Sequence, residues 1–119
     1  MAASAFLRVV RGEDKGKGWE LDAQQVYTLG RSRKANLRVS DATVSGTHAS
    51  LECREGVWFV GDLGSTHGTR VNRQRILGEK ALFDRDSVRI GKTLMEFREY
   101  EELPSDDLAE IDRGVNLPE

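Results

Sequence analysis

Three glycine-containing loops carry side chains that suit a tetrahedral anion. The loops are Gly30-Arg31-Ser32, Val44-Ser45-Gly46-Thr47-His48 and Asp62-Leu63-Gly64-Ser65-Thr66-His67-Gly68-Thr69. An arginine guanidinium offers a rigid fork of donors to two phosphate oxygens, and serine and threonine hydroxyls donate at short range. Backbone N–H groups in glycine-containing turns can add an anion-binding nest. Arg31, Ser45 and Thr66 therefore predict a binding site whose natural candidate ligand is phosphate on a peptide.

Short apolar or alternating runs separate these loops and must position them. The predicted strands cover residues 5–10, 19–21, 26–29, 37–39, 48–53, 57–60, 87–90 and 93–100. Turn signals divide them at intervals of about 8–12 residues, which is typical of a β-sandwich or barrel. Loops from the same end of a sandwich meet in space, so Arg31, Ser45 and Thr66 could converge although 14 and 21 positions separate them.

The chain of 119 residues has a basic body and an acidic C-terminal segment. Residues 1–99 contain 17 Lys/Arg and 13 Asp/Glu, a net charge of +4, whereas residues 100–119 contain one arginine and seven acids, a net charge of −6. The length predicts one domain, over residues 1–100. We expect residues 101–119 to be an acidic linker or tail, with one short helix after Pro104 as an alternative.

Composition excludes several classes of protein. No apolar run is long enough for a membrane span, and Arg8 interrupts the N-terminal apolar stretch before it reaches signal-peptide length. A cytoplasmic location without a membrane partner is therefore expected. Cys53 is the only cysteine, and with His48 and His67 it offers too few ligands for a structural zinc site. Neither a metal nor a cofactor is expected.

Basic residues gather in one short segment of the body. Arg31, Arg33, Lys34 and Arg38 could form a nucleic-acid patch, but no aromatic residues interleave them and the C-terminal segment is acidic. Nucleic acid is therefore not an expected partner.

The same loops also contain residues that could form an enzyme active site. Residues 64–68 superficially resemble a nucleophile elbow. Ser45, His48 and Asp62 could be arranged as a catalytic triad. An elbow needs a strand that runs into a helix, whereas residues 69–72 show no helical pattern. No P-loop or dinucleotide fingerprint is present. The sequence therefore favours a binding module, and no enzymatic activity is expected.

Four motifs, in order along the chain, resemble those of the forkhead-associated (FHA) domain. They are Thr28-Leu29-Gly30-Arg31-Ser32, Val44-Ser45-Gly46-Thr47-His48-Ala49, Asp62-Leu63-Gly64-Ser65-Thr66-His67-Gly68-Thr69 and Val71-Asn72. The resemblance covers about residues 5–99. It implies an all-β fold, a sandwich of two twisted, mainly antiparallel sheets with about eleven strands, which binds phosphothreonine peptides through loops at one end.

The resemblance also implies which residues contact the ligand. Arg31 and Ser45 would bind the phosphate, and Thr66 would help to hold the phosphothreonine. Gly46 and His67 fall at peptide-binding positions, and both depart from the family pattern. The family often has arginine, lysine or asparagine at the first position and usually asparagine at the second. Histidine can donate one hydrogen bond, but it differs in shape and titrates near neutral pH. We therefore expect weaker or pH-sensitive binding, and not its loss.

Three further residues would support the site, as the resemblance implies. Gly30 and His48 would be structural, with His48 bracing the arginine loop through a hydrogen bond. Asn72 would tie down the turn after Gly68.

The first interpretation of function is a phosphothreonine-dependent signalling adaptor that recruits proteins phosphorylated by a Ser/Thr kinase. Arg33, Lys34 and Arg70 would rim the phosphate loops and favour acidic residues near the phosphothreonine. The alternative is an FHA-fold scaffold or oligomerisation module that no longer reads phosphopeptides. An Arg31→Ala substitution separates the two, because it abolishes binding only in the first case.

The phosphothreonine is expected to come from outside this chain. Its six threonines all lie in the body: Thr28, Thr43, Thr47, Thr66, Thr69 and Thr93. The ligand would therefore belong to another protein or to a longer parent chain. The oligomeric state stays open.

Overall fold

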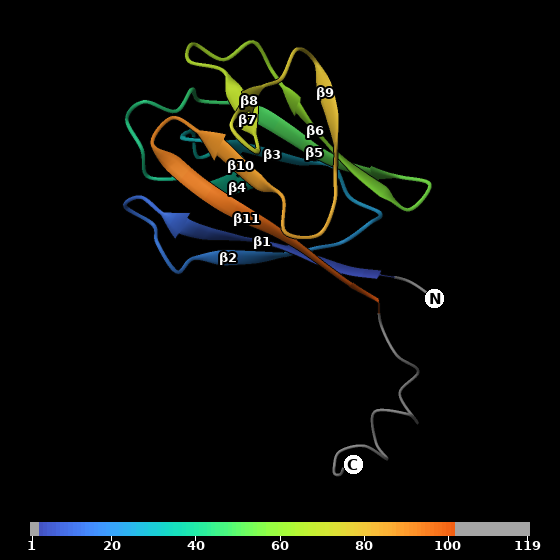
Figure 1. Cartoon of the computed structure of the whole chain (residues 1–119). Helices are drawn as coiled ribbons and strands as arrows, with labels where there is room; N and C mark the ends of the chain where they lie inside the picture. The colour runs from blue at the N-terminus through green and yellow to red at the C-terminus, as the bar shows by residue number, and fades with distance from the viewer. Residues whose placement is uncertain (1–2, 102–119) are drawn as a thin grey trace.

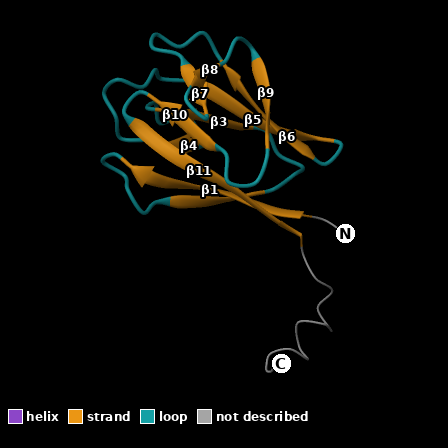
Figure 2. Ribbon diagram, viewed as in Figure 1, coloured by secondary structure: helices purple, strands orange, loops and turns teal. Residues whose placement is uncertain are grey.

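Eleven strands in two sheets form the fold of residues 3–101, which are the residues that the computed structural model describes (Figures 1 and 2). One sheet contains β1 (Ala3–Arg11), β2 (Gly18–Leu21), β7 (Thr69–Val71), β8 (Gln74–Arg75), β10 (Ser87–Ile90) and β11 (Thr93–Glu101). The other contains β3 (Tyr27–Gly30), β4 (Leu37–Arg38), β5 (Ala49–Arg54), β6 (Val57–Asp62) and β9 (Glu79–Leu82). Over this range, no helix has the length and apolar character needed to cross a membrane.

Strand order brings distant parts of the chain together. The six-stranded sheet has the order β2-β1-β11-β10-β7-β8, and the five-stranded sheet has the order β4-β3-β5-β6-β9. The long strands β1 and β11 run side by side as an antiparallel pair (Figure 1). β3 and β4 form a parallel pair, and the other pairs are antiparallel. The sheets are therefore mainly antiparallel, as expected.

The core lies between the two sheets. Alternation along β11 turns Met95 and Phe97 inward, where both are fully buried. The buried Trp58 of β6 reaches across to Phe97, with 6.5 Å between ring centroids. This contact joins a strand of one sheet to a strand of the other, and burial of such large apolar rings is a main source of stability. The predicted all-β sandwich is confirmed.

Eight of the eleven strands were predicted from hydrophobic periodicity, namely β1 to β6, β10 and β11. Periodicity did not predict β7, β8 and β9. β7 has only three residues, and β8 has only two, which are both exposed. Neither strand is long enough for apolar alternation to mark it. The predicted acidic tail and its alternative short helix lie outside the described residues.

A two-residue turn sets the register between β7 and β8. Asn72 and Arg73 both have positive φ, 49° and 75°, as a tight turn matched to the strand twist requires. Arg70 consequently lies opposite Arg75. This register contributes to the charge pattern on the outer face of the six-stranded sheet.

Candidate functional site

Hydrogen bonds bring Arg31, Ser45 and Thr66 together. The Thr66 N–H donates to Ser45 Oγ at 3.1 Å, which joins the β6–β7 loop to the β4–β5 loop. The Arg31 N–H donates to the Ser45 carbonyl at 3.1 Å, and Arg31 Nε donates to the Val44 carbonyl at 3.0 Å. Three loops that are distant in sequence thus meet at one place, as the sequence predicted.

This arrangement leaves donors for an anion. Arg31 is exposed, and within its side chain only Nε is bonded to another of residues 3–101, so both Nη groups remain for a ligand. Ser45 Oγ accepts from the Thr66 amide and keeps its own hydroxyl hydrogen to donate. The Thr66 side chain is also exposed. Together these groups can donate to several oxygens of one phosphate.

Gly30 allows the loops to approach so closely. A Cβ atom at this buried position would collide with the Gly46 carbonyl oxygen, and would lie 2.7 Å from the Gly46 carbonyl carbon and 3.0 Å from Thr47 Cα. The neighbouring Ser32 N–H donates to the same Gly46 carbonyl at 3.1 Å. Position 30 therefore requires glycine because the opposing atoms are backbone, which no rotamer change can move.

His48 is fully buried and links two of the loops. Its Nδ1 accepts a hydrogen bond from the Ser45 N–H at 3.1 Å, so Nε2 carries the proton and donates to the Gly68 carbonyl at 2.9 Å. The expected brace is therefore corrected in one respect. The His48 ring holds the Ser45 loop and the Gly68 turn, and its bonds do not run to the loop of Arg31.

Asp62 organises the β6–β7 loop from the end of β6. Its carboxylate accepts from Ser65 Oγ at 2.6 Å and from Thr69 Oγ1 at 2.7 Å, and also from the N–H groups of Gly64 and Ser65, each at 3.0 Å. Partial burial acts to raise the pKa of Asp62, but these hydrogen bonds outweigh it and lower the pKa below its ordinary value. The loop that carries Thr66 is thus folded around an ionised carboxylate.

Asp41 plays the same part for the β4–β5 loop. It accepts from the Thr43 hydroxyl and N–H at 2.6 and 2.9 Å, from the Lys92 N–H at 2.9 Å and from Thr93 Oγ1 at 2.8 Å. Burial opposes ionisation, but these bonds lower the pKa of Asp41 to about 2. The carboxylate therefore fastens the loop of Ser45 to the β10–β11 turn.

Neither aspartate was predicted as a support of the site. The sequence suggests Asp62 only as a member of a catalytic triad, and it does not single out Asp41. The available signal was local: each is followed by residues whose hydroxyl and N–H groups can bond back to it, Thr43 after Asp41 and Ser65 after Asp62.

Ser45, His48 and Asp62 do not form a catalytic triad. The His48 ring accepts from the Ser45 backbone, while Ser45 Oγ is bonded to the Thr66 amide. The Asp62 carboxylate is bonded to Ser65 and Thr69, not to the histidine. Among residues 3–101, no group of three or more His, Cys, Asp or Glu is placed to hold a metal ion.

Gly46 and His67 lie beside the three convergent residues and leave room for a ligand. A Cβ atom at Gly46 would make one ordinary contact, 3.6 Å from Ser32 Cβ. Larger side chains therefore fit at this position. His67 is exposed, and its ring forms no hydrogen bond with the residues that the structure describes.

Asn72 holds the β7–β8 turn, which follows Gly68 and β7 in the chain. Its Nδ2 donates to Asp86 at 2.9 Å, and its Oδ1 accepts from the Ser87 N–H at 2.9 Å. These bonds fasten the β7–β8 turn to the start of β10. The turn at Gly68 is held instead by Ser65, whose Oγ accepts from the Gly68 N–H at 2.8 Å, and by His48.

The three residues expected to rim the site are not all in one place. Arg33 and Lys34 are exposed in the β3–β4 loop, next to Arg31. Arg70 is on β7, where it points to the outer face of the six-stranded sheet and lines a pocket with Arg89. Arg70 is thus placed on the sheet face, and its contact with residues near the phosphothreonine stays a prediction.

Comparison with known proteins identifies a family over most of the described body. A family model described as FHA domain matches residues 27–91. The oxoglutarate dehydrogenase inhibitor of Corynebacterium efficiens is 38% identical over 96 residues, which cover 81% of this chain and 66% of that protein. The chain thus spans just under two thirds of this curated relative.

Solved structures with the same fold agree with this match. The FHA domain of a Chlamydia trachomatis protein has a TM-score of 0.78 at 26% identity, over 82% of this chain and 99% of that domain. A structure from a structural and functional analysis of phosphothreonine-dependent FHA domain interactions has a TM-score of 0.74 at 30% identity, over 84% of this chain and 99% of the other.

Proposed function

This chain belongs to the FHA domain family, and from that membership we propose that it is a cytoplasmic, phosphothreonine-dependent peptide-binding module. It recruits proteins that a Ser/Thr kinase has phosphorylated. It works by binding, without turnover and without a cofactor.

One observation carries this proposal: the convergence of Arg31, Ser45 and Thr66 through the Ser45 Oγ and carbonyl bonds. Arg31 presents a charged fork of donors, and Ser45 and Thr66 each add a hydroxyl group. Charge-assisted hydrogen bonds of this kind contribute roughly 1.5–3 kcal/mol each. A phosphate in this position would therefore dominate the affinity, and an unmodified threonine would lack its main contacts.

Relatives support a regulatory role of this kind. One similar structure comes from work on phosphothreonine-dependent FHA domain interactions, and one relative is an oxoglutarate dehydrogenase inhibitor. The first description concerns phosphothreonine-dependent interactions, and the second names an inhibitor of an enzyme. We infer that this chain controls a partner in the same manner, with the phosphothreonine supplied in trans or by a longer parent chain.

Gly46 and His67 moderate the affinity. Each replaces a side chain that in the family bonds to phosphate or peptide backbone. A neutral hydrogen bond contributes only about 0.5–1.5 kcal/mol, less than the charged contacts of Arg31. Phosphopeptide binding is therefore weakened by these two residues and retained.

A titration with three matched peptides tests the function. They carry phosphothreonine, phosphoserine or unmodified threonine in one otherwise identical sequence chosen from a degenerate library. We expect the phosphothreonine peptide to bind, the phosphoserine peptide to bind less tightly and the unmodified peptide not to bind. Arg31→Ala should weaken binding by roughly 10- to 150-fold.

The control removes an exposed arginine elsewhere. Arg54 on β5 is paired with Glu79 and lies outside the three loops, so Arg54→Ala should leave the phosphothreonine affinity unchanged. Absence of phosphate-dependent binding at about millimolar peptide would contradict the proposal. A dissociation constant of about 1 mM corresponds to a binding free energy of only roughly −4 kcal/mol. The scaffold interpretation would then hold.

A further inference from the structure

Four arginines lie in one line across the outer face of the six-stranded sheet. Arg11 of β1 is opposite Leu94 of β11, and Leu94 is opposite Arg89 of β10. Arg89 is opposite Arg70 of β7, which is opposite Arg75 of β8. All four arginines are exposed. We call Arg11, Arg70, Arg75 and Arg89 the arginine row.

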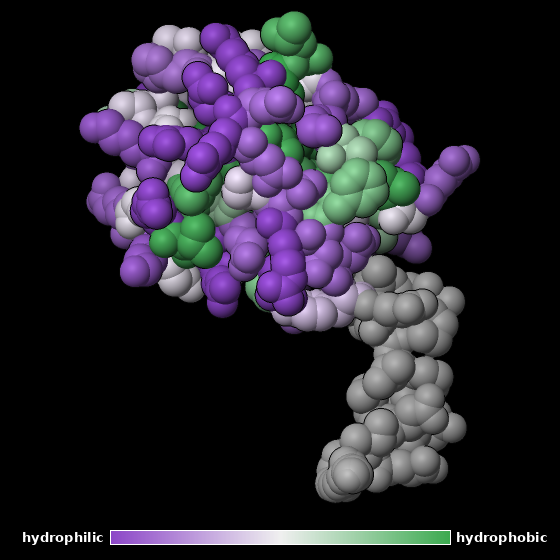
Figure 3. Space-filling view, viewed as in Figure 1, coloured by the Kyte–Doolittle hydropathy of each residue, from purple (hydrophilic) through white to green (hydrophobic). Residues whose placement is uncertain are grey.

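The arginine row borders a hollow in the surface. A pocket of about 520 Å³ is lined by Arg11, Arg70, Arg73, Ser87, Arg89 and Leu94. Figure 3 shows mainly hydrophilic side chains over β10 and β11, with separate small apolar patches. The pocket is therefore a strongly basic recess with one apolar residue, Leu94, along its lining.

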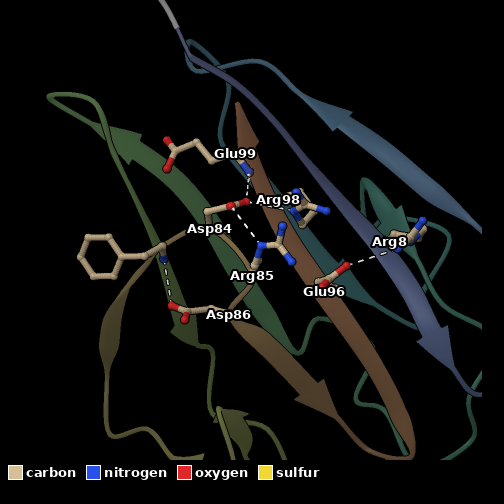
Figure 4. Close-up of polar contacts among 8 residues, drawn as sticks. Arg8, Asp84, Arg85, Asp86, Glu96, Arg98 and Glu99 are labelled. Atoms are coloured by element: carbon tan, nitrogen blue, oxygen red, sulfur yellow. Dashed lines mark hydrogen bonds and ion pairs between the residues drawn. The ribbon is translucent and has the colours of Figure 1, made fainter. Parts of the chain in front are cut away.

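No carboxylate among residues 3–101 forms an ion pair with these four arginines. The ion pairs on this part of the molecule engage other arginines: Glu96 pairs with Arg8 at 3.3 Å, and Asp84 pairs with Arg98 at 3.0 Å (Figure 4). None of the ion pairs between described residues includes a member of the arginine row.

Like charges in directly opposite positions on neighbouring strands are unfavourable. Arg70 is opposite another arginine on each side, Arg89 and Arg75. The side chains of Arg70 and Arg89 bond only to carbonyl groups, those of Arg73 at 3.4 Å and Gly91 at 3.2 Å. Such an arrangement costs folding free energy, and a bound anionic partner relieves this repulsion.

The pocket is distinct from the loop site, although the two surfaces adjoin. None of the residues that line it belongs to the three loops that hold Arg31, Ser45 and Thr66. Arg75 provides the boundary, because its Nε would lie only 2.6 Å from a Cβ atom at Gly68. A partner anchored at the loops could therefore continue onto the sheet face.

We propose that the arginine row is a second binding surface, which docks an extended acidic segment of a partner protein. This goes beyond phosphothreonine recognition, since it requires no phosphate. The row crosses five neighbouring strands, a span of about 19 Å at roughly 4.8 Å between strands, which matches about six extended residues. Carboxylates on alternate residues of the segment meet the guanidinium groups, and an apolar residue covers Leu94.

A peptide fits this surface better than nucleic acid does. Proteins that hold single strands combine basic residues with aromatic side chains on which bases stack. The residues that line the pocket include no aromatic side chain. Arginine forks pair with carboxylates in a two-point geometry, so they suit aspartate and glutamate.

The test uses an unphosphorylated, fluorescently labelled eight-residue peptide with alternating glutamates and a central leucine. Binding to the full chain is measured by anisotropy at low salt and at physiological salt. A matched peptide with glutamine in place of glutamate is the ligand control. We expect binding of the glutamate peptide only, weakened by salt, and about tenfold weaker binding to an Arg70→Gln, Arg89→Gln double variant.

The protein control has the same change in net charge on the other sheet, in an Arg54→Gln, Lys80→Gln double variant. Its affinity should remain near that of the original chain. Equal weakening in both variants would overturn the proposal, because bulk charge would then explain the binding.

Three other outcomes would also overturn it. The first is no binding of the glutamate peptide at low salt. The second is tighter binding of a single-stranded oligonucleotide with the same charge. The third is peptide binding that appears only after Asp106→Asn and Asp107→Asn, which would make the acidic end of this chain the occupant.

Discussion

Gly30 and Gly46 meet backbone to backbone, so that a Cβ atom at position 30 would lie 2.7 Å from the carbonyl carbon of Gly46. This contact closes the distance between the β3–β4 and β4–β5 loops. It allows the Arg31 N–H to donate to the Ser45 carbonyl at 3.1 Å. The close approach of the two glycines thus brings the start of the Arg31 loop against the loop that carries Ser45.

Gly30→Ala should separate these loops. The added methyl group meets backbone atoms of Gly46 and Thr47, so the free energy of unfolding should fall by about 1–3 kcal/mol. Phosphothreonine-peptide affinity should fall as well. Urea unfolding monitored by Trp fluorescence, together with a peptide titration, checks both effects.

Gly46→Ala is the matched control, because its methyl group meets only Ser32 Cβ, at 3.6 Å. The stability of this variant should change by no more than about 0.5 kcal/mol. If both alanine variants lowered the free energy of unfolding equally, the close contact at Gly30 would not be the cause of the destabilisation.

Replacement of the buried His48 should destabilise the loops that its imidazole ring joins. His48→Phe leaves the Ser45 N–H and the Gly68 carbonyl without their partner, at a cost of about 2–4 kcal/mol in the free energy of unfolding. The same exchange at the exposed His67 should cost about 0.5 kcal/mol or less. Thermal unfolding of the two variants distinguishes the cases, and equal melting temperatures would contradict the assigned role of His48.

Acid should weaken the fold through Asp41. Hydrogen bonds lower its pKa to about 2 from an ordinary 3.8, so the folded state holds the carboxylate more strongly in its ionised form. Its stabilising contribution is present above pH 3.8 and is lost as the pH falls toward about 2. Urea unfolding of the original chain should therefore show a decline across this range.

Asp41→Asn has no carboxylate to protonate at this position. It should be less stable at neutral pH and should lose less stability between pH 3.8 and about 2 than the original chain does. Profiles that run parallel throughout this interval would contradict the role assigned to Asp41.

Much of this structure was accessible from the sequence because its signals are local. Strands with apolar alternation, such as the one that buries Met95 and Phe97, were predicted at nearly their observed positions. Arg31, Ser45 and Thr66 were predicted to converge from their place in loops between strands. The hydrogen bond from the Thr66 N–H to Ser45 Oγ shows how two of these loops meet.

Features that depend on register or on contact across the fold were not accessible. Arg70 looks like a neighbour of the phosphate loops in the sequence, but alternation on β7 turns it onto the sheet face opposite Arg89. The hydrogen-bond acceptor of the His48 ring is the Gly68 carbonyl, which lies 20 positions further along the chain and is brought close only by the fold. The arginine row is assembled from four strands, β1, β7, β8 and β10, so no short segment of sequence reveals it.

Restoring the family residues at the two departures should raise affinity. The conformation of Gly46 and the space around it accommodate a side chain, and His67 is exposed, so Gly46→Asn and His67→Asn should both fold normally. Each adds a neutral hydrogen bond to the peptide, worth roughly three- to tenfold in affinity. Calorimetric titration with one phosphothreonine peptide checks this. Unchanged or lower affinity in both variants would show that these positions do not face the ligand.

The claim that Arg31, Ser45 and Thr66 hold the phosphate is tested most directly by NMR. Amide and arginine side-chain correlation spectra are recorded during titration with a phosphothreonine peptide and, separately, with its unmodified counterpart. The account predicts that the largest shifts fall at these three residues and at Gly46 and His67, with the phosphorylated peptide alone. Largest shifts elsewhere in the chain, or equal shifts with the unmodified peptide, would contradict it.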